Sequence, residues 1–309
     1  MHIPVLLKQS IKNLNIKKNG IYIDATFGSG GHSKEILKKI GKKGILYSID
    51  RDPESIKIAK NIKDSRFHII HGLFSNIHEY CKKYNILKKI NGVILDLGIS
   101  SIQLNNSNRG FSFKNNGPLD MRMNQKIGIP ASKWLMKTTQ KKIFTILKKY
   151  GEERYSKKIS VSIIKNRKIK PILYTHQLKK IISKSIPYQK KHSSRRSFQA
   201  IRIYLNNELN ELKKFLKNVL KILSPNGKLC IISFHSLEDR IVKKFMFKNS
   251  RKIPNLPSSI PLTEKELLKI NKKKCKLKIY KKIFPNKKEI LKNIRSRSAI
   301  LRIAKLKKK

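Results

Sequence analysis

The first residues whose types and spacing suit chemistry are an acid and a glycine-rich string. Asp24 ends the apolar run 20–24, and Phe27-Gly-Ser-Gly-Gly-His32 follows it before a helical pattern begins. Glycines between a strand and a helix let the backbone come close to a ligand. A dinucleotide site would want glycines at positions 28, 30 and 33, but position 33 is serine. An acid just before the loop suits a cationic amino acid better than a pyrophosphate.

Two more acids stand at the ends of apolar runs. Asp50 ends the run 44–50, and Asp96 comes near the end of the run 92–97. A carboxylate at Asp50 can accept both hydroxyls of a ribose, which NAD and S-adenosylmethionine both carry; the alternative is an ordinary cap or loop acid. Ligands of open α/β sheets lie at the carboxyl ends of the strands. Three acids there, with no phosphate-binding lysine between them, favour a positively charged cofactor such as S-adenosylmethionine.

An alternation of strand and helix patterns explains how these acids are brought together. Near-continuous apolar strands separated by helices predict a parallel sheet that is covered on both faces. Asp52 and Pro53 are expected to open a helix, with Asp52 as its N-cap. The predicted strands are 20–24, 44–50, 67–71, 92–97, 228–234 and 299–304, the predicted helices of this part are 33–40, 52–60 and 208–223, and Pro225-Asn226-Gly227 is a predicted turn.

The middle of the chain follows a different pattern. From about residue 105 there is no good strand, and helical periodicity covers 131–150, 155–166, 175–185 and 197–205. We therefore predict an α/β sheet with an inserted all-helical domain. The predicted parts are 1–107 and 206–309 for the sheet, the second with a basic tail, and 108–205 for an inserted substrate-recognition domain.

Composition bounds the class of protein. The chain has 309 residues, and its 73 Lys and Arg against 18 acids give a formal net charge of +55. This charge favours a nucleic acid partner, and compositional drift toward lysine is the alternative source of part of it. The cysteines are far apart and form no CxxC pair, so we expect no disulfide framework and no metal site. No long apolar run opens the chain, so we expect a soluble cytoplasmic protein without a membrane association.

Several long strings then match one known family in a single order. The chain resembles the bacterial 16S ribosomal RNA cytosine-N4 methyltransferases, the MraW or RsmH family, nearly from end to end. The matching strings include Tyr22-Ile-Asp-Ala-Thr-Phe-Gly-Ser-Gly-Gly-His-Ser33, Leu95-Asp-Leu-Gly-Ile-Ser-Ser101, Arg109-Gly-Phe-Ser-Phe113, Gly117-Pro-Leu-Asp-Met-Arg-Met123, Ile232-Ser-Phe-His-Ser-Leu-Glu-Asp-Arg240 and Arg295-Ser-Arg-Ser298.

This resemblance implies a fold, a cofactor and a substrate. It implies a class I S-adenosylmethionine-dependent methyltransferase sheet, Rossmann-like, with a helical insertion. It also implies methylation of the exocyclic N4 amine of a cytidine in 16S ribosomal RNA, free or in the small ribosomal subunit. Gln103 as a cofactor contact rests on the resemblance alone, and Phe74 has the alternative of an ordinary core aromatic. The implied contacts to S-adenosylmethionine are Gly30, Gly31, His32, Asp50, Phe74, Asp96 and Gln103.

The exocyclic amine of cytosine is a poor nucleophile, because its lone pair is delocalised into the ring. It therefore needs hydrogen-bond acceptors that take up the developing positive charge. We predict that Ser100, Ser101 or a nearby backbone carbonyl accepts from the amine, with Asp96 as an alternative acceptor. His235 is a further candidate, either to remove a proton or to hold the base, against the alternative that it only builds its loop.

Contacts to RNA are expected from aromatic and cationic side chains. Phe111 and Phe113 are candidates to stack on a base drawn out of its helix, and core packing is the alternative. Arg195, Arg196 and Arg202 are candidates for phosphate contacts, against a merely solvated surface.

Three rival functions stand beside the methyltransferase. A ribosome assembly factor with a worn fold is disfavoured by the intact glycine loop and acids. A nicotinamide-dependent enzyme is disfavoured by Ser33 and by the acids at the strand ends. A methyltransferase that acts on DNA or protein differs only in its target, and the family resemblance alone favours RNA.

Overall fold

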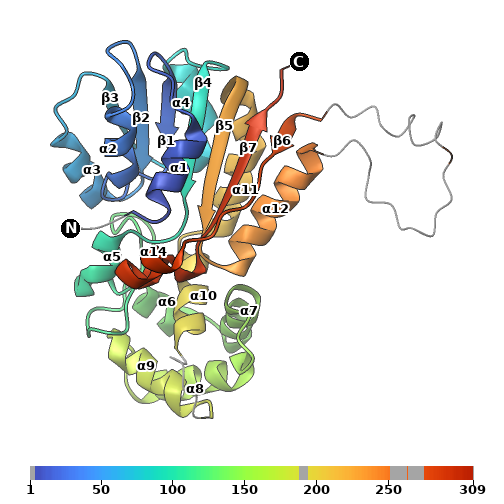
Figure 1. The fold of residues 1–309 in the computed structure, drawn as a ribbon. Coiled ribbons are helices and arrows are strands. Elements are labelled where there is room, and N and C mark those ends of the chain that lie inside the picture. Colours follow the sequence, from blue (N-terminus) through green and yellow to red (C-terminus); the bar gives the residue numbers. More distant parts are fainter. Residues whose placement is uncertain (1–3, 188–193, 251–262, 264–274, 309) are drawn as a thin grey trace. The chain divides into compact units, whose positions relative to one another are not determined.

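The computed structural model describes residues 4–187, 194–250, 263 and 275–308, and the chain divides into two compact units (Figure 1). The first, called the sheet unit below, comprises Met1–Asp50, Ser55–Gly98 and Leu212–Lys309. The second, called the helical unit, comprises Arg51–Glu54 and Ile99–Glu211. The assignment of substrate recognition to residues 108–205 remains a prediction.

The sheet unit is built on one seven-stranded sheet with the order β3-β2-β1-β4-β5-β7-β6. Strands β1 to β5 run parallel, as the near-continuous apolar runs predict, while β7 is antiparallel to both β5 and β6. The α/β class expected from the sequence is confirmed. The strands are β1 Ile21–Asp24, β2 Ile45–Asp50, β3 Phe67–His71, β4 Ile90–Asp96, β5 Leu223–Ser233, β6 Leu277–Ile279 and β7 Ile300–Leu306.

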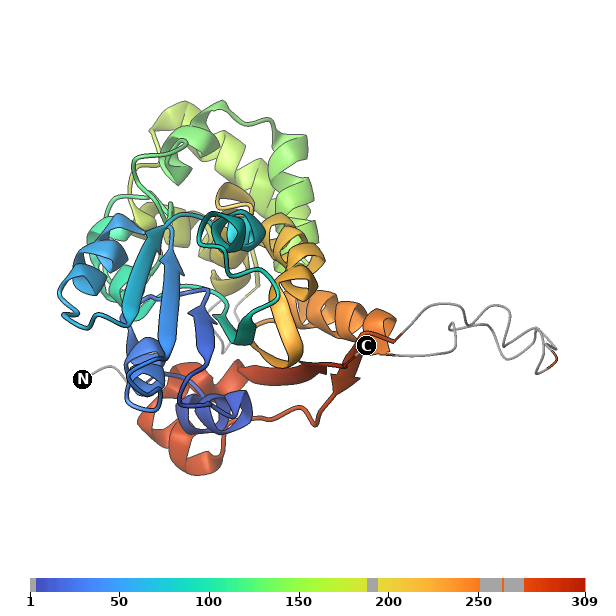
Figure 2. The same ribbon diagram turned by 90° about the horizontal axis from the view of Figure 1, so that it is seen from above.

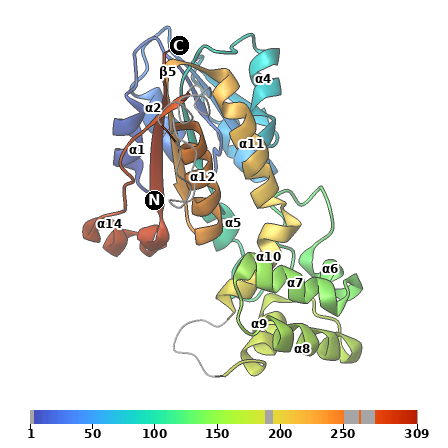
Figure 3. The ribbon, with the colours of Figure 1, turned by 90° about the vertical axis from the view of Figure 1, so that its right-hand side faces the viewer.

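Helices cover both faces of this sheet, as Figures 2 and 3 show for α1 and α2 on one face and α4 and α11 on the other. Alternate side chains of one strand serve the two cores: in β4, Val93 and Leu95 enter one cluster and Ile94 the other. Fixed strands on a two-sided core hold their carboxyl ends in place. One face carries α1 Leu7–Leu14, α2 Gly31–Leu37 and α3 Pro53–Lys60, and the other carries α4 Ile77–Lys83, α11 Glu208–Ile222 and α12 Ser236–Ser250.

The helical unit surrounds a core of its own, which includes the buried Trp134. The single helix predicted over 131–150 is wrong, because two helices cover that stretch. Thr139 breaks it: its side chain accepts a hydrogen bond from the Lys142 backbone N–H at 3.3 Å and caps the second helix. The helices are α5 Ser101–Asn105, α6 Ala131–Lys137, α7 Gln140–Gly151, α8 Ser156–Ile169, α9 Thr175–Lys184 and α10 Arg195–Leu205.

The turn predicted at Pro225-Asn226-Gly227 is instead a bulge within β5. The pairing with β4 passes from Ile90↔Leu223 to Gly92↔Lys228, so the intervening residues of β5 are looped out. Asn226 takes the left-handed conformation that this bulge requires, with φ 65°. The sequence also missed α1, α4, the short β6 and α14 Lys287–Lys292. Within the described ranges, no helix is long and apolar enough to cross a membrane.

Candidate functional site

Three acids meet at the carboxyl edge of the sheet. Asp24, Asp50 and Asp96 are the last residues of β1, β2 and β4, which are neighbours in the order β2-β1-β4. The sequence predicted this placement from the apolar runs that precede each acid. Carboxylates so close together repel one another unless a proton or a cation separates their charges.

The glycine string is shaped by close contacts and by one of these acids. Gly28 and Gly30 have φ values of 55° and 79°, in the left-handed region that favours glycine. The Gly28 N–H donates to Asp50 Oδ2 at 2.7 Å. A Cβ atom at Gly30 would lie 2.6 Å from the Phe27 ring, and one at Gly31 would lie 2.0 Å from Pro4 Cγ. Glycine is therefore required at both positions whichever ligand binds.

Asp24 holds the ends of the glycine loop through hydrogen bonds. Its Oδ2 accepts from the Ser33 hydroxyl at 2.6 Å, its Oδ1 accepts from the Thr26 N–H at 3.2 Å, and Ser33 Oγ also lies 2.8 Å from Ser48 Oγ. Ser33, the residue that weakens a dinucleotide site, is thus the partner of this acid. Burial raises the pKa of the Asp24 carboxyl from 3.8 to about 7, and the hydrogen bonds from Ser33 and Thr26 oppose part of that rise.

The raised pKa of Asp24 predicts a pH-dependent stability. The folded protein binds a proton at Asp24 at pH values where the unfolded chain has lost it, so the free energy of unfolding falls between pH 3.8 and about 7. Each unit of pKa difference is about 1.4 kcal/mol. In Asp24→Asn this contribution is absent, so its stability relative to the unmodified protein should rise with pH over that range. Urea unfolding followed by circular dichroism measures this, and parallel pH profiles would contradict it.

Asp96 presents an acceptor that nothing in the described chain uses. Its Oδ1 is buried without a hydrogen-bond partner among the described residues, while its Oδ2 lies 3.8 Å from His32 Nδ1. Burial, and then the charges of Asp24 and Glu238, raise the pKa of Asp96 well above its ordinary value. A buried acceptor without a donor is costly, so this oxygen suits a ligand that brings a donor and a positive charge.

Phe74 lies in a short 3-10 helix, Phe74–Asn76, at the end of the loop that follows β3. Its ring packs edge-on against Phe215 with the centroids 5.7 Å apart, and the side chain is half-buried. Its contact with Phe215 is typical of a core aromatic, while its partly exposed ring is accessible to a ligand. Contact with an adenine therefore stays a prediction.

A second acid–histidine pair follows β5. His235 Nε2 lies 3.1 Å from Glu238 Oε1, and the two side chains are 10% and 2% exposed. Glu238 Oε2 also accepts from the Phe234 N–H at 2.9 Å, so this carboxylate is fixed by the backbone. Asp239, the next residue, instead binds Arg302 of β7 at 2.6 Å. The sequence had named His235 and had not given Glu238 a role toward it.

The other predicted site residues near Asp96 in the sequence belong to the helical unit. Ser100 and Gln103 form a capping box at α5, in which Ser100 Oγ accepts from the Gln103 N–H and Gln103 Oε1 accepts from the Ser100 N–H. Gln103 Nε2 donates to Asp52 Oδ2 at 2.7 Å. Ser101 is buried beside them. These local roles are structural, and the cofactor contact of Gln103 and the acceptor roles of Ser100 and Ser101 remain predictions.

A buried ionic network that no local sequence pattern predicted surrounds Arg109, which is 1% exposed. Arg109 Nη1 lies 2.9 Å from Asp52 Oδ2 and 3.0 Å from Glu54 Oε2, and Nη2 donates to the carbonyl of Met123 at 2.8 Å. Asp52 also caps α3 through the Glu54 N–H, as predicted. The strings that hold Arg109 and Asp52 were visible in the sequence, but nothing local indicated that they pair.

The aromatic residues predicted to stack on RNA bases are found in the core of the helical unit. Phe111 is 6% exposed, with the Arg109 guanidinium 5.9 Å from its ring centroid. Phe113 is half-buried and packs edge-on against Phe198, with the centroids 5.2 Å apart. A stacking role for Phe111 would require its ring to leave this core, so its burial favours core packing instead.

The three predicted arginines differ in their surroundings. Arg202 is held by Glu208 in a bidentate pair at 2.9 Å, so its charge is already neutralised. Arg195 and Arg196 are exposed in the first turn of α10, with Arg196 donating to the Glu152 carbonyl at 3.4 Å. The described residues contain no group of three or more His, Cys, Asp or Glu placed to hold a metal ion. Phosphate contacts remain predictions for Arg195 and Arg196, and the Arg202 ion pair argues against that role.

Comparison with known proteins gives matches over almost the whole chain. Residues 1–307 match the MraW methylase family. A protein named Ribosomal RNA small subunit methyltransferase H from Buchnera aphidicola subsp. Cinara cedri (strain Cc) is 59% identical over 307 residues, covering 99% of both chains. Proteins of the same name are 56% identical in Buchnera aphidicola subsp. Acyrthosiphon pisum (strain APS), over 99% of this chain and 97% of that one, and 54% identical in Wigglesworthia glossinidia brevipalpis, over 98% of each.

Proposed function

The chain belongs to the MraW methylase family, and from this premise we propose that it transfers a methyl group from S-adenosylmethionine to the exocyclic N4 amine of a cytidine in 16S ribosomal RNA. The observation that carries the cofactor part is the unpartnered buried Oδ1 of Asp96 beside the glycine loop. The names of the relatives support the small-subunit RNA as target. The proposed place of action is the cytoplasm, where small subunits are assembled.

The chemistry of the carboxyl edge fits this cofactor. S-adenosylmethionine carries an ammonium and a sulfonium and supplies an electrophilic methyl group. Asp50, at the end of β2, is the residue that would accept the ribose hydroxyls. The Asp96 carboxylate would accept from a cationic donor, and the repulsion among Asp24, Asp96 and Glu238 would decrease when a positive charge enters. The turn at Gly30 and Gly31 lets the chain pass close to such a ligand.

Amine methylation also requires a proton acceptor. After the methyl group is transferred, the nitrogen carries a positive charge and must lose one proton. Both ring nitrogens of His235 are buried without a hydrogen-bond partner among the described residues, and Nε2 lies 3.1 Å from Glu238 Oε1. An imidazole nitrogen is a suitable proton acceptor in catalysis. We assign a ring nitrogen of His235 as the proton acceptor and the neighbouring Glu238 carboxylate as the group that positions the ring.

Glu238→Gln tests this positioning role. An amide in place of the carboxylate can still accept from the Phe234 N–H, but it removes the negative charge that lies 3.1 Å from His235 Nε2. We expect kcat to fall about tenfold, which corresponds to about 1.4 kcal/mol in the activation free energy, with the KM for RNA unchanged. The dependence of kcat on pH should change as well, which a purely structural role would not produce.

Glu79→Gln on α4 is the matched control, because Glu79 is 71% exposed and carries the same charge. It should leave both kcat and the pH profile unchanged. An unaltered pH profile in Glu238→Gln, with a lower melting temperature, would instead make Glu238 a loop-building residue only.

A labelled methyl group on the cofactor makes the proposed function testable. The protein is incubated with methyl-labelled S-adenosylmethionine and either free 16S ribosomal RNA or assembled small subunits, and the RNA is then digested to nucleosides for mass spectrometry. The expected product is a cytidine methylated on its exocyclic nitrogen. Whether free RNA or the assembled subunit is the better substrate indicates whether the protein acts before or after assembly. Cofactor binding without labelled RNA would favour a DNA or protein target, and absence of both would favour a non-enzymatic assembly factor.

A further inference from the structure

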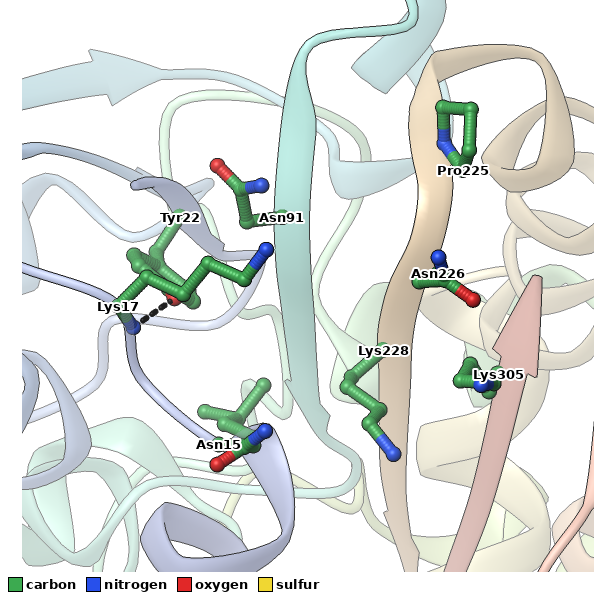
Figure 4. Close-up of a pocket in the computed structure, with 9 residues that line it drawn as sticks. Asn15, Lys17, Tyr22, Asn91, Pro225, Asn226, Lys228 and Lys305 are labelled. Atoms are coloured by element: carbon green, nitrogen blue, oxygen red, sulfur yellow. Dashed lines mark hydrogen bonds between the residues drawn. The ribbon is translucent and has the colours of Figure 1, made fainter. Parts of the chain in front are cut away.

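A polar pocket lies at the opposite edge of the sheet from the three acids. Its volume is about 150 Å³. Figure 4 shows Asn15, Lys17 and Tyr22 on one side, Asn226, Lys228 and Lys305 on the other, and Asn91 of β4 between them. Asn91 is the second residue of β4, Lys228 of β5 pairs with Gly92 next to it, and Lys305 comes near the end of the antiparallel β7. The pocket therefore belongs to the amino edge of the parallel strands.

The lining contains lysine and asparagine but no acid. Lys17 and Lys305 have no acidic partner among the described residues, and Lys228 Nζ donates only to the Tyr280 hydroxyl, at 3.1 Å. The hydrogen bond from Lys228 lowers the pKa of the Tyr280 hydroxyl, and the charges of Lys305 and Lys278 lower it further. The local field is thus strongly positive and is not balanced by the protein itself.

The strand register places like charges side by side. Lys228 of β5 pairs directly with Lys305 of β7, and Lys305 pairs directly with Lys278 of β6. Directly opposite residues of antiparallel strands point to the same face, so these three lysines extend from one face of the sheet in a row. Like charges in such pairs destabilise a sheet. A row of this kind is explained if an anion binds there and offsets the repulsion.

We propose that this amino-edge pocket binds a backbone phosphate of the substrate RNA, at a second contact separate from the site of methyl transfer. The proposal rests on the proposed function for its choice of RNA as the source of the phosphate. Lysine ammonium groups and asparagine amides donate to phosphate oxygens without selecting a base. The strand β4 runs about 20 Å between the two edges, at about 3.3 Å per residue. Only an RNA long enough to pass around the sheet unit reaches both places.

The test uses the full-length protein with Lys305→Gln and the double variant Lys228→Gln/Lys305→Gln. Affinity for 16S ribosomal RNA is measured across a range of salt concentrations. We expect weaker binding, with the slope of log K against log salt shallower by roughly one for each phosphate-contacting lysine removed. Lys305→Arg keeps the charge and should retain most of the affinity. A double variant with Lys57→Gln and Lys60→Gln, two exposed lysines of α3, removes equal charge and should change the slope less.

Stability gives an independent readout. The Gln variants relieve like-charge pairs, so in chloride they should melt at or above the temperature of the unmodified protein. Inorganic phosphate at equal ionic strength should raise the melting temperature of the unmodified protein and raise it less in the variants. Stabilisation by phosphate together with unchanged RNA affinity would overturn the proposal in favour of a site for a free anion. The proposal would also be overturned if the Lys228→Gln/Lys305→Gln variant had the same RNA affinity and salt slope as the α3 control variant.

Methyl transfer separates this proposal from the proposed function. A short RNA fragment that holds only the target cytidine and its neighbours cannot reach the amino edge. The variants should methylate that fragment as fast as the unmodified protein does and lose activity only on long RNA. A different result is that the unmodified protein methylates no RNA while the variants still bind RNA more weakly and with a shallower salt slope. That result would support the phosphate-binding pocket and contradict the proposed reaction.

Discussion

Replacing Asp96 by asparagine is expected to weaken the binding of S-adenosylmethionine by about 10- to 100-fold, because a hydrogen bond to a charged group contributes about 1.5–3 kcal/mol. The unpartnered Oδ1 of Asp96 is the reason for this expectation. The free carboxyl has a raised pKa, and a bound cation would lower it. Binding should therefore release a proton, so that the affinity increases with pH. Titration calorimetry in two buffers of different ionisation enthalpy measures both effects.

The variant should fold, since Asp96→Asn removes a carboxyl that burial and two neighbouring acids already disfavour in its charged form. Its melting temperature without cofactor should equal or exceed that of the unmodified protein. In Asp24→Asn, by contrast, cofactor affinity should change less, because the Asp24 oxygens are held by Ser33 and Thr26. If Asp96→Asn lowers kcat while the affinity for cofactor is normal, Asp96 is the acceptor for the target amine instead.

Arg109→Met is expected to destabilise the helical unit by about 3–5 kcal/mol, because removing one partner of a buried ion pair leaves the other charge uncompensated. Asp52 is 1% exposed and would lose its guanidinium partner, and the carbonyl of Met123 would lose its donor. The chain contains one tryptophan, Trp134, and it lies in the core of this unit. Its fluorescence in urea therefore reports the unfolding of the helical unit alone.

A double variant and a surface pair complete this test. Adding Asp52→Asn to Arg109→Met removes the uncompensated charge and should restore part of the lost stability. Lys38→Met breaks the Lys38–Glu35 pair of α2, where the lysine is 70% exposed, and should cost less than about 1 kcal/mol. A cost for Arg109→Met as small as that of Lys38→Met would show that the network contributes little to stability.

Local patterns were enough to predict the sheet and the edge at which its acids gather. Apolar runs of strand length that end in Asp24, Asp50 and Asp96 place each acid at a strand end without any knowledge of tertiary contacts. Patterns were less reliable where a short-range interaction competes with periodicity. Thr139 caps a new helix within a continuous helical pattern, and a bulge absorbs a string of turn residues in β5.

Residue type alone did not separate functional from structural roles. Phe111 and Arg202 had the chemistry for RNA contacts, yet one is buried in a core and the other is paired with Glu208. Burial and pairing depend on which distant segments fold together, and no local string specifies them. The same limit explains why Glu238 was missed, since its importance comes from its distance to His235 and from the backbone that fixes it.

By itself, the sequence determined the α/β class, the glycine loop, the strand-end acids and, through its long family strings, the methyltransferase family. These features follow from periodicity and from residue order, which are written along the chain. Only the tertiary structure decided that Asp24 is bonded to Ser33, that Arg109 neutralises Asp52, and that Lys228 and Lys278 flank Lys305 at the far edge of the sheet. Each of these features depends on strand register or on the packing of segments that are remote in sequence. Register and packing therefore decide which charges are paired, which are buried and which remain accessible to a ligand.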